Sequence, residues 1–323
     1  MDYVVARNVV GLLGNCRIIA KNRALKDDLI KNYNVGRCGL YPAFPDVLIA
    51  ARHIARKFPE KRILKIGMRH GAYHFKDFVS AKRYHAFNYF LVTSRREVEL
   101  AREKGIHNTV AIGYPKLDDA FNGKITDDDL KKFREKLKID HNKPTVIFTA
   151  TWEKSGMSAV DRWSSGLADL TDEFNILVSL HAWVPAAVRK LIRNTPGVYY
   201  VDSKDILPYL MVSDVMVSDT SSIIAEFCAL DKPIITFRTG RGKRTSDEIL
   251  EMLEKISFRV TSFGELTIAL QRAISEPRLH ADARHYFNQI MFDALDGKAG
   301  VRAAEFIKTK VYSKRDHGRG HAI

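Results

Sequence analysis

The first candidates for chemistry in this sequence are small hydroxyl side chains that follow a short apolar segment. Residues 217–237 read VSDTSSIIAEFCALDKPIITF, which predicts a strand, the hydroxyl run, a helix and a second strand. Main-chain N–H groups at the start of a helix can bind phosphate, and the helix dipole favours an anion there. Capping of the helix by the same side chains is the alternative. Hydroxyl groups that could also donate to a phosphate belong to Ser218, Thr220, Ser221 and Ser222.

A histidine stands where another strand is expected to end. Arg69, His70 and Gly71 follow the apolar run of residues 62–67. Ligands of open α/β folds bind at the carboxyl ends of parallel strands, so these residues would face a substrate. An imidazole, with its ordinary pKa near neutrality, can take a proton from an attacking hydroxyl, and glycine permits close backbone approach. His70 is therefore a candidate general base, with a structural histidine as the alternative.

Two more polar residues follow expected strands in the second half of the chain. His181 comes after residues 176–180, and Thr151 comes after residues 145–149. His181 could donate a hydrogen bond to a phosphate or stabilise a leaving group, or it could be a satisfied histidine at a strand end. Trp152, next to Thr151, could pack on a base or a sugar, or could fill space in the core.

A basic loop follows the strand expected over residues 233–237. Its cations, Arg238, Arg241, Lys243 and Arg244, could hold a phosphate of a donor or an acceptor, or could contact anionic lipid headgroups. A solvated basic loop is the alternative.

Composition indicates a protein with a sizeable core and an anionic partner. The chain has 323 residues, of which 46% are hydrophobic, and its formal net charge is +14 with a pI of about 9.6. Nucleic acid, a phosphorylated substrate or an anionic membrane would each suit this charge. Three isolated cysteines favour a reducing cytoplasm. No segment has the apolar length of a membrane span and no signal peptide is recognisable, so we expect membrane contact to be peripheral.

Several common motifs are missing from the sequence. It contains neither GxGxxG nor GxxxxGK[ST], so dinucleotide-binding and P-loop readings have no support. It also lacks HExxH, paired CxxC and a GxSxG elbow around a serine. Residues 127–129 are consecutive aspartates at an expected helix start, which favours capping over metal binding. We therefore expect no metal site.

Apolar segments alternate with amphipathic ones, which predicts parallel sheets with crossover helices. Residues 2–13 read as a strand that runs into a turn. The other expected strands are 45–51, 62–67, 89–93, 110–113, 145–149, 174–180, 197–201, 215–217 and 233–237. The expected helices are 21–32, 52–58, 94–104, 186–193, 206–212, 223–230, 246–255, 263–275 and 299–308.

A polar, charged stretch at residues 122–143 interrupts this alternation and predicts a domain boundary. We predict a short N-terminal acceptor-side domain at residues 1–122, a nucleotide-donor-binding domain at 123–312 and a basic tail at 313–323.

Taken in order, these motifs resemble the CDP-glycerol glycerophosphotransferase family, the teichoic-acid primases and polymerases with a GT-B fold. The resemblance runs from about residue 46 to residue 308. It rests on PDVLIAA at 45–51, His70-Gly71, GYPKLD at 113–118, Thr151-Trp152, Leu180-His181, SDTSS at 218–222, DKPI at 231–234, and DGKA at 296–299 followed by Arg302. One departure is that the usual Trp-His-Gly of the family is Arg69-His70-Gly71 here.

The resemblance implies a role for each candidate residue. His70 would be the catalytic base on the acceptor hydroxyl, and His181, also assigned to catalysis, would contact the donor phosphate. Glu226 stands where the family usually has aspartate and would accept hydrogen bonds from ribose or glycerol hydroxyls. Donor binding is assigned to Ser218, Asp219, Thr220, Ser221, Ser222, Glu226 and Thr151, and phosphate or acceptor binding to Arg69, Arg238 and Arg241.

The resemblance also implies the fold and the reaction. We expect an α/β, GT-B-like protein with two Rossmann-like domains whose parallel sheets face a central cleft. It would move an alditol phosphate from a CDP-activated donor to a surface-polymer or lipid-linked acceptor in cell-wall or capsule polysaccharide synthesis. No cofactor is expected, and the location would be cytoplasmic, with peripheral contact to the inner face of the cell membrane. The alternatives are a glycosyltransferase that uses a UDP- or CMP-sugar and a basic nucleic-acid-binding protein, which no recognisable motif supports.

Overall fold

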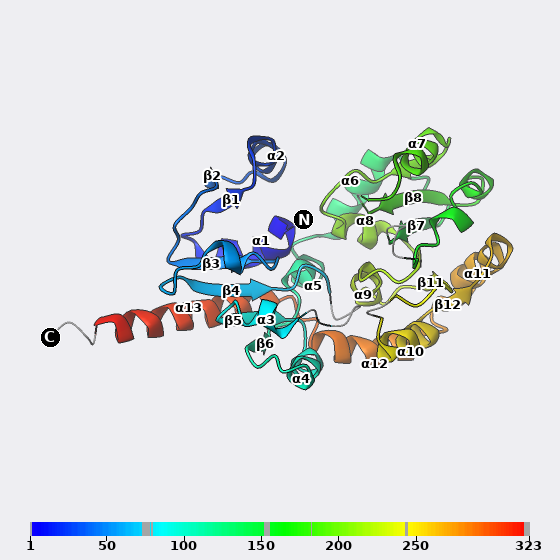
Figure 1. The fold of residues 1–323 in the computed structure, drawn as a ribbon. Coiled ribbons are helices and arrows are strands. Elements are labelled where there is room, and N and C mark those ends of the chain that lie inside the picture. Colours follow the sequence, from blue (N-terminus) through cyan, green and yellow to red (C-terminus); the bar gives the residue numbers. More distant parts are fainter. Residues whose placement is uncertain are drawn as a thin grey trace. The chain divides into compact units, whose positions relative to one another are not determined.

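The chain folds into two compact units, each built on a parallel sheet (Figure 1). The computed structural model describes residues 2–72, 78, 80–151, 156–181, 183–242 and 245–319, without the side chains of residues 2 and 313–319. The first unit comprises Met1–His70, Val79–Asp118 and Asp296–Ile323, and the second comprises Gly71–Phe78 and Asp119–Leu295. Trp152, Lys243 and Arg244 lie outside the described residues.

The sheet of the first unit has the strand order β3-β4-β5-β6, with all pairs parallel. Ile66 and Met68 of β4 are buried, and this strand reads as a nearly unbroken apolar run because a central parallel strand is covered on both faces. The strands are β3 (Val47–Ala50), β4 (Leu64–Met68), β5 (Tyr89–Val92) and β6 (Thr109–Ala111). The helical segments are α1 (Asp2–Leu13), η1 (Ala55–Lys57), α3 (Ala81–Tyr84), α4 (Arg95–Glu103), η2 (Pro115–Leu117) and α13 (Ala299–Arg319), and α5 (Asp118–Phe121) begins at the division between the units.

A smaller parallel sheet in the same unit pairs β1 (Ile18–Ala20) with β2 (Cys38–Leu40). Helix α2 (Arg23–Tyr33) packs on it around a small core that contains Ala20 and Leu29. The helix expected over residues 21–32 is thereby confirmed.

The prediction of a strand over residues 2–13 was wrong, because this segment forms helix α1. Val4, Val5 and Val9 are all buried, and their spacing puts them on one face of a helix. That face packs against α13. The β-branched valines misled the interpretation, since such residues favour strands unless packing decides otherwise.

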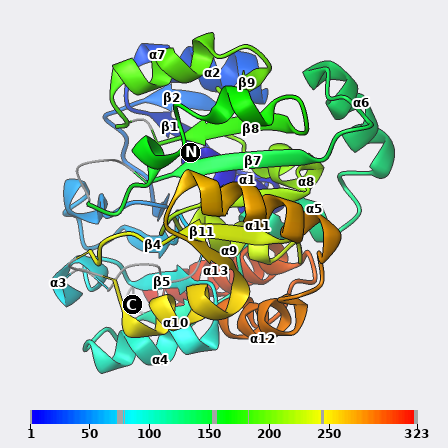
Figure 2. The ribbon, with the colours of Figure 1, turned by 90° about the vertical axis from the view of Figure 1, so that its right-hand side faces the viewer.

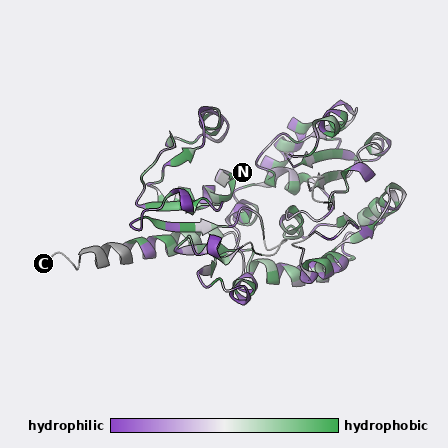
Figure 3. Ribbon diagram, in the orientation of Figure 1, coloured by the Kyte–Doolittle hydropathy of each residue, from purple (hydrophilic) through white to green (hydrophobic). Residues whose placement is uncertain are grey.

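The second unit has a larger parallel sheet in the order β12-β11-β10-β7-β8-β9. Figure 2 shows β7 and β8 side by side, and Figure 3 shows β8 in the hydrophobic colour. The strands are β7 (Thr145–Ala150), β8 (Asn175–Leu180), β9 (Val198–Tyr200), β10 (Val215–Ser218), β11 (Ile234–Phe237) and β12 (Phe258–Val260). The helical segments are α6 (Asp127–Leu137), η4 (Val160–Arg162), η5 (Leu167–Leu170), α7 (Ala186–Asn194), α8 (Leu207–Val212), α9 (Ile223–Cys228), α10 (Asp247–Ile256), α11 (Phe263–Ser275) and α12 (Ala281–Phe292).

A hydrogen-bonded clasp joins the end of the chain to the first unit. The Asp118 carboxylate accepts bonds from the main-chain N–H groups of Ala299 (3.0 Å) and Gly300 (2.6 Å). Arg302 donates through Nε to the carbonyl oxygen of Ile112 at 3.0 Å. A Cβ at Gly113, which has φ +83°, would lie 2.9 Å from the Cβ of Ala299. The GYPKLD and DGKA…R motifs thus hold α13 in place.

This clasp explains how the two units differ from the predicted domains. The predicted boundary at 122 lies close to the division at Asp118, but residues 296–312, expected in the second domain, group with the first unit. Helix α13 also continues to Arg319, so part of the segment expected as a tail is helical.

Candidate functional site

The centre of the candidate site is the turn between β10 and α9, and a buried carboxylate organises it. Asp219 has no exposed surface. Its oxygens accept hydrogen bonds from the main-chain N–H groups of Thr220 (2.6 Å), Thr151 (2.9 Å) and Ala159 (3.3 Å). Burial raises the pKa of Asp219, and the bonds from Thr151 and the other amides offset part of that rise. Asp219, which was predicted to bind the donor, therefore holds the turn through its bonds to these three N–H groups.

The hydroxyl groups of the turn divide into two kinds. Ser218 is buried, and its Oγ accepts a hydrogen bond from Thr149 Oγ1 at 2.8 Å. This bond links the neighbouring strands β7 and β10. Thr220 is only 6% exposed, yet its buried Oγ1 has no hydrogen-bond partner among the described residues. A buried hydroxyl in this state costs free energy unless a ligand or water satisfies it. Thr220 therefore points to a ligand at the turn.

Ser221 and Ser222 are partly exposed at the start of α9. Ser222 stands at the N-cap position but makes no side-chain cap hydrogen bond within the described part of the chain, which counts against capping as its role. The helix has six residues, so the anion-binding potential here lies in the turn rather than in a long helix dipole. A Cβ at Gly71, which groups with this unit, would lie 2.9 Å from Ser222 Oγ.

His181 and Thr151 lie at the same edge of the sheet as the turn. They follow β8 and β7, and β7 lies between β8 and β10 with parallel pairing to both. Thr151 is buried, and its Oγ1 donates to the carbonyl oxygen of Met157 at 3.3 Å, so its hydroxyl is used within the protein. Thr151 therefore supports the turn, mainly through the N–H that it gives to Asp219.

The hydrogen bonding of His181 fixes which ring nitrogen can donate. Its Nδ1 accepts from the main-chain N–H of Trp183 at 3.2 Å, and the exposed ring packs edge-on against the Trp183 ring. A neutral imidazole that accepts at Nδ1 carries its proton on Nε2. This tautomer places the ring proton on Nε2, the nitrogen that would donate to a phosphate in the predicted role.

Glu226 is buried in the middle of α9, below the turn. The contact of Glu226 with ribose or glycerol hydroxyls stays a prediction.

Two arginines of the basic loop, Arg238 and Arg241, each pair with a carboxylate. Arg238 donates to both oxygens of Glu254, at 2.5 and 2.6 Å. Arg241 pairs with Asp247 at 2.7 Å. Both arginine side chains are about half exposed. A phosphate would have to share these cations with their present partners, and such exposed pairs exchange partners at little cost.

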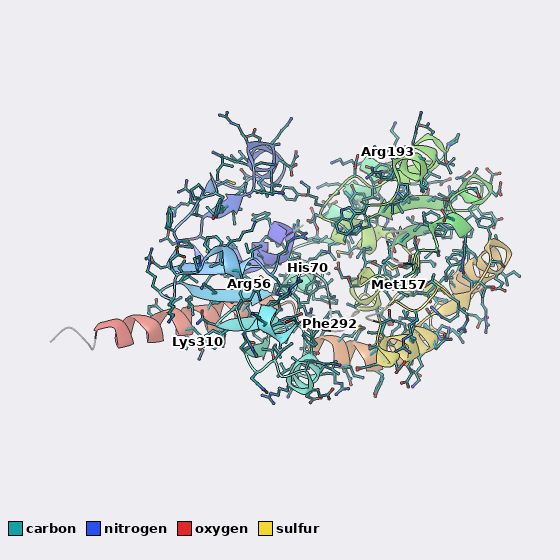
Figure 4. All side chains as sticks on the ribbon, in the orientation of Figure 1. Arg56, His70, Met157, Arg193, Phe292 and Lys310 are labelled. Carbon is teal, nitrogen blue, oxygen red and sulfur yellow. The ribbon has the colours of Figure 1, made fainter. Side chains whose placement is uncertain are left out.

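In the first unit, His70 follows the carboxyl end of β4 and is exposed, and Figure 4 labels it near the end of that strand. The carbonyl oxygen of His70 accepts a hydrogen bond from the Tyr114 hydroxyl at 3.3 Å. The imidazole therefore follows a strand end, and a hydrogen bond holds the main chain of His70 in position, as a general base requires.

Arg69 has a different position from the one predicted. Its side chain is 14% exposed and forms an ion pair with Glu97, which is fully buried. Arg69 was assigned to phosphate or acceptor binding, but its guanidinium faces inward to a carboxylate because this buried acid needs a counter-charge. Glu97 belongs to helix α4, whose N-cap residue is Ser94. The N–H of Glu97 donates to Ser94 Oγ at 3.2 Å, but its side chain turns to Arg69 and Thr93.

Comparison with known proteins places the chain in a family. Residues 65–309 match the CDP-Glycerol:Poly(glycerophosphate) glycerophosphotransferase family. A teichoic acid poly(ribitol-phosphate) polymerase of Bacillus spizizenii is 26% identical over 222 residues, which cover 62% of this chain and 34% of the relative. A teichoic acid poly(glycerol phosphate) polymerase of the same organism is 22% identical over 133 residues, 39% of this chain and 34% of the relative. The chain thus spans about a third of the length of these curated relatives.

Solved structures share the fold at low identity. A variant of wall teichoic acid polymerase TagF superposes with a TM-score of 0.76 at 15% identity, covering 98% of this chain and 87% of that chain. The UDP-GlcNAc 2-epimerase from Neisseria meningitidis gives a TM-score of 0.62 at 13% identity, with 96% of each chain covered. The predicted α/β, GT-B-like fold is thereby confirmed. Since the family match extends over most of the chain, the protein belongs to the CDP-glycerol:poly(glycerophosphate) glycerophosphotransferase family.

Proposed function

We propose that this protein transfers an alditol phosphate, such as glycerol phosphate, from a CDP-activated donor to a surface-polymer or lipid-linked acceptor in cell-wall or capsule polysaccharide synthesis. The observation that carries the proposal is the turn at residues 219–222, where a buried carboxylate fixes the backbone and the buried Thr220 hydroxyl lacks a protein partner among the described residues. Family membership supports the reaction class. An alditol phosphate as the transferred group is supported by the two relatives, a poly(glycerol phosphate) polymerase and a poly(ribitol-phosphate) polymerase.

The proposed chemistry gives each group one task. His70 takes the proton from the acceptor hydroxyl as its oxygen forms a bond to the donor's alditol-linked phosphorus. The P–O bond to the cytidine phosphate breaks, and CMP leaves. The amides and hydroxyls at Ser221 and Ser222, together with the Nε2–H of His181, stabilise the charge that develops on the donor phosphates.

The proposed mechanism uses no cofactor and assigns no metal ligands. The one acidic side chain of the turn, Asp219, is already occupied by three main-chain N–H donors, which makes its oxygens poor candidates for a cation. The charge of the donor phosphates would instead be balanced by hydrogen bonds from the turn and by the basic loop.

A second candidate is a glycosyltransferase that uses a nucleotide sugar. The fold likeness to UDP-GlcNAc 2-epimerase, at a TM-score of 0.62, motivates it. The same edge of the same kind of sheet can hold CDP-glycerol or a UDP-sugar, because both present a pyrophosphate.

Donor identity can be tested by thermal unfolding in the presence of candidate ligands. A ligand that binds the folded state at about 100 times its Kd adds roughly 2.7 kcal/mol of stability, which corresponds to a shift of several degrees. We expect CDP-glycerol or CDP-ribitol to raise the melting temperature more than UDP-sugars or free nucleotides do. A shift with UDP-sugars alone would replace the phosphotransferase proposal by the glycosyltransferase one.

We also propose that the first unit contacts the anionic inner face of the cell membrane. Residues 40–45, LYPAFP, carry no charge, and Phe44 is 75% exposed and Tyr41 54% exposed. The surrounding residues 15–62 contain eleven lysines and arginines against four acidic residues. Exposed aromatic side chains beside basic ones suit the interface of an anionic bilayer. No helix among the described residues has the length and hydropathy to span a membrane.

Vesicle sedimentation tests this contact. The protein should sediment with phosphatidylglycerol-containing vesicles at low salt and stay in solution with pure phosphatidylcholine. Phe44→Ser should weaken binding several-fold, whereas Ile268→Ser, at an equally exposed position of the second unit, should not change it. Equal binding by both variants would show that the LYPAFP segment is not the contact.

A further inference from the structure

We infer that the buried Arg69–Glu97 ion pair positions His70, so that Arg69 is a positioning residue rather than a substrate ligand. This inference rests on the proposed role of His70 as the base of the transfer. All the residues that carry it belong to the first unit.

The ion pair is embedded in a network of hydrogen bonds behind β4. Glu97 Oε2 accepts from the main-chain N–H of Thr93 at 2.9 Å and from Thr93 Oγ1 at 3.1 Å, while Oε1 faces Arg69. The Arg69 guanidinium also donates to the hydroxyl of Tyr84, whose ring packs edge-on against that of His53 with 4.7 Å between centroids. Burial acts to lower the pKa of Arg69, but Glu97 and Tyr84 raise it overall, so the guanidinium stays charged.

The network fixes the main chain on both sides of the imidazole. On one side, the N–H of Arg69 donates to the carbonyl oxygen of Leu91 at 3.1 Å, and its side chain is held by Glu97. On the other side, the Tyr114 hydroxyl donates to the carbonyl oxygen of His70. The last hydrogen bond from β4 to β5 is the one that Arg69 donates, so the Tyr114 bond holds the main chain just beyond it.

Stability alone does not explain a buried ion pair at this position. Desolvation of two charges consumes most of the attraction between them, and well-packed apolar side chains of similar volume are often as stabilising. Here Arg69 Nη2 faces Glu97 Oε1 while Thr93 holds the other carboxylate oxygen, so the two planar groups are kept in one arrangement. The arrangement therefore favours orientation of the neighbouring residue as the role of the pair.

The test is the double variant Arg69→Met with Glu97→Leu, which removes both charges and keeps the volume. We expect it to unfold within a few degrees of the wild type, but to lose about tenfold to hundredfold in kcat with an unchanged KM for the donor, because small misplacements of a base have effects of this size. The backbone order parameter of the His70 amide should fall from about 0.85 toward about 0.6. The matched control is the double variant Arg96→Met with Glu99→Leu, which removes an exposed ion pair on α4, the helix that carries Glu97. It should change neither kcat nor the order parameter of the His70 amide.

Wild-type kcat in the folded double variant, or an unchanged order parameter, would overturn the inference. Should the double variant not fold, Tyr114→Phe removes only the bond to the His70 carbonyl oxygen and should lower the order parameter and kcat in the same direction by a smaller factor. If the wild type transfers no alditol phosphate, the proposed function fails, but the order parameter still decides whether the pair positions His70.

Discussion

Replacing His70 by glutamine is expected to lower the rate of transfer by about 10²–10⁴-fold, the usual contribution of a general base. Glutamine keeps a polar side chain of similar reach but cannot accept a proton at neutral pH. The residues proposed to hold the donor lie in the second unit, so the thermal shift given by CDP-glycerol should be retained. Initial rates and melting curves on the same preparation would separate the two effects.

His107→Gln is a suitable control, since this histidine is exposed, belongs to the same unit and has no proposed role. A His70→Gln protein that keeps more than a tenth of the wild-type rate would remove His70 from the catalytic role. Loss of the thermal shift in that variant would mean instead that His70 binds the donor.

The second large effect is expected for Asp219→Asn. The amide that replaces the carboxylate has a single acceptor oxygen, so N–H groups now bonded to the carboxylate would face an NH₂ group or lose their partner. Leaving buried donors unsatisfied costs about 1–3 kcal/mol, and the turn that they define would shift. We expect a lower free energy of unfolding and loss of the thermal shift with CDP-glycerol, measured by denaturant titration and by melting curves.

Asp172→Asn, at an exposed position of the same unit, provides the matched control and should leave both quantities unchanged. Wild-type stability in Asp219→Asn would contradict the role of the carboxylate in holding the turn.

Periodicity predicted most strands of the two larger sheets, but it missed β12 and the small β1–β2 sheet. The strands expected over residues 145–149 and 174–180 match β7 and β8, because buried parallel strands appear as short apolar runs between amphipathic helices. The helix α12 was missed, since its buried face includes Arg284 and Asn288, which do not count as apolar in such a pattern. Arg284 is buried because it donates to Asp231 at 2.9 Å, a partner 53 positions away in the sequence.

In the candidate site, too, contacts between residues distant in sequence could not be predicted. The SDTSS run was recognised as a unit, but its members have different tasks: Ser218 and Asp219 support the turn, while Thr220, Ser221 and Ser222 remain available to a ligand. Which side chain of a turn points inward depends on the neighbouring strands, and a single sequence does not contain that information. The same reason explains why the sequence did not indicate the ion pair of Arg69, whose carboxylate partner is on α4.

The GYPKLD and DGKA…R motifs have a structural role that a sequence cannot distinguish from a functional one. Asp118 and Gly300 are 182 positions apart, yet a carboxylate–amide hydrogen bond joins them and closes the first unit. A short signature with glycine, lysine and arginine suggests phosphate binding as readily as it suggests a clasp. Only the fold shows that Arg302 donates to a main-chain oxygen and to Asp296.

Phosphorus NMR of the wild-type protein with CDP-glycerol and a glycerol-phosphate-primed lipid acceptor tests the central claim most directly. Disappearance of the pyrophosphate resonances, with equal growth of a CMP resonance and of a phosphodiester resonance on the acceptor, is the predicted result. Unchanged CDP-glycerol in a sample whose UDP-sugar is consumed under the same conditions would contradict it.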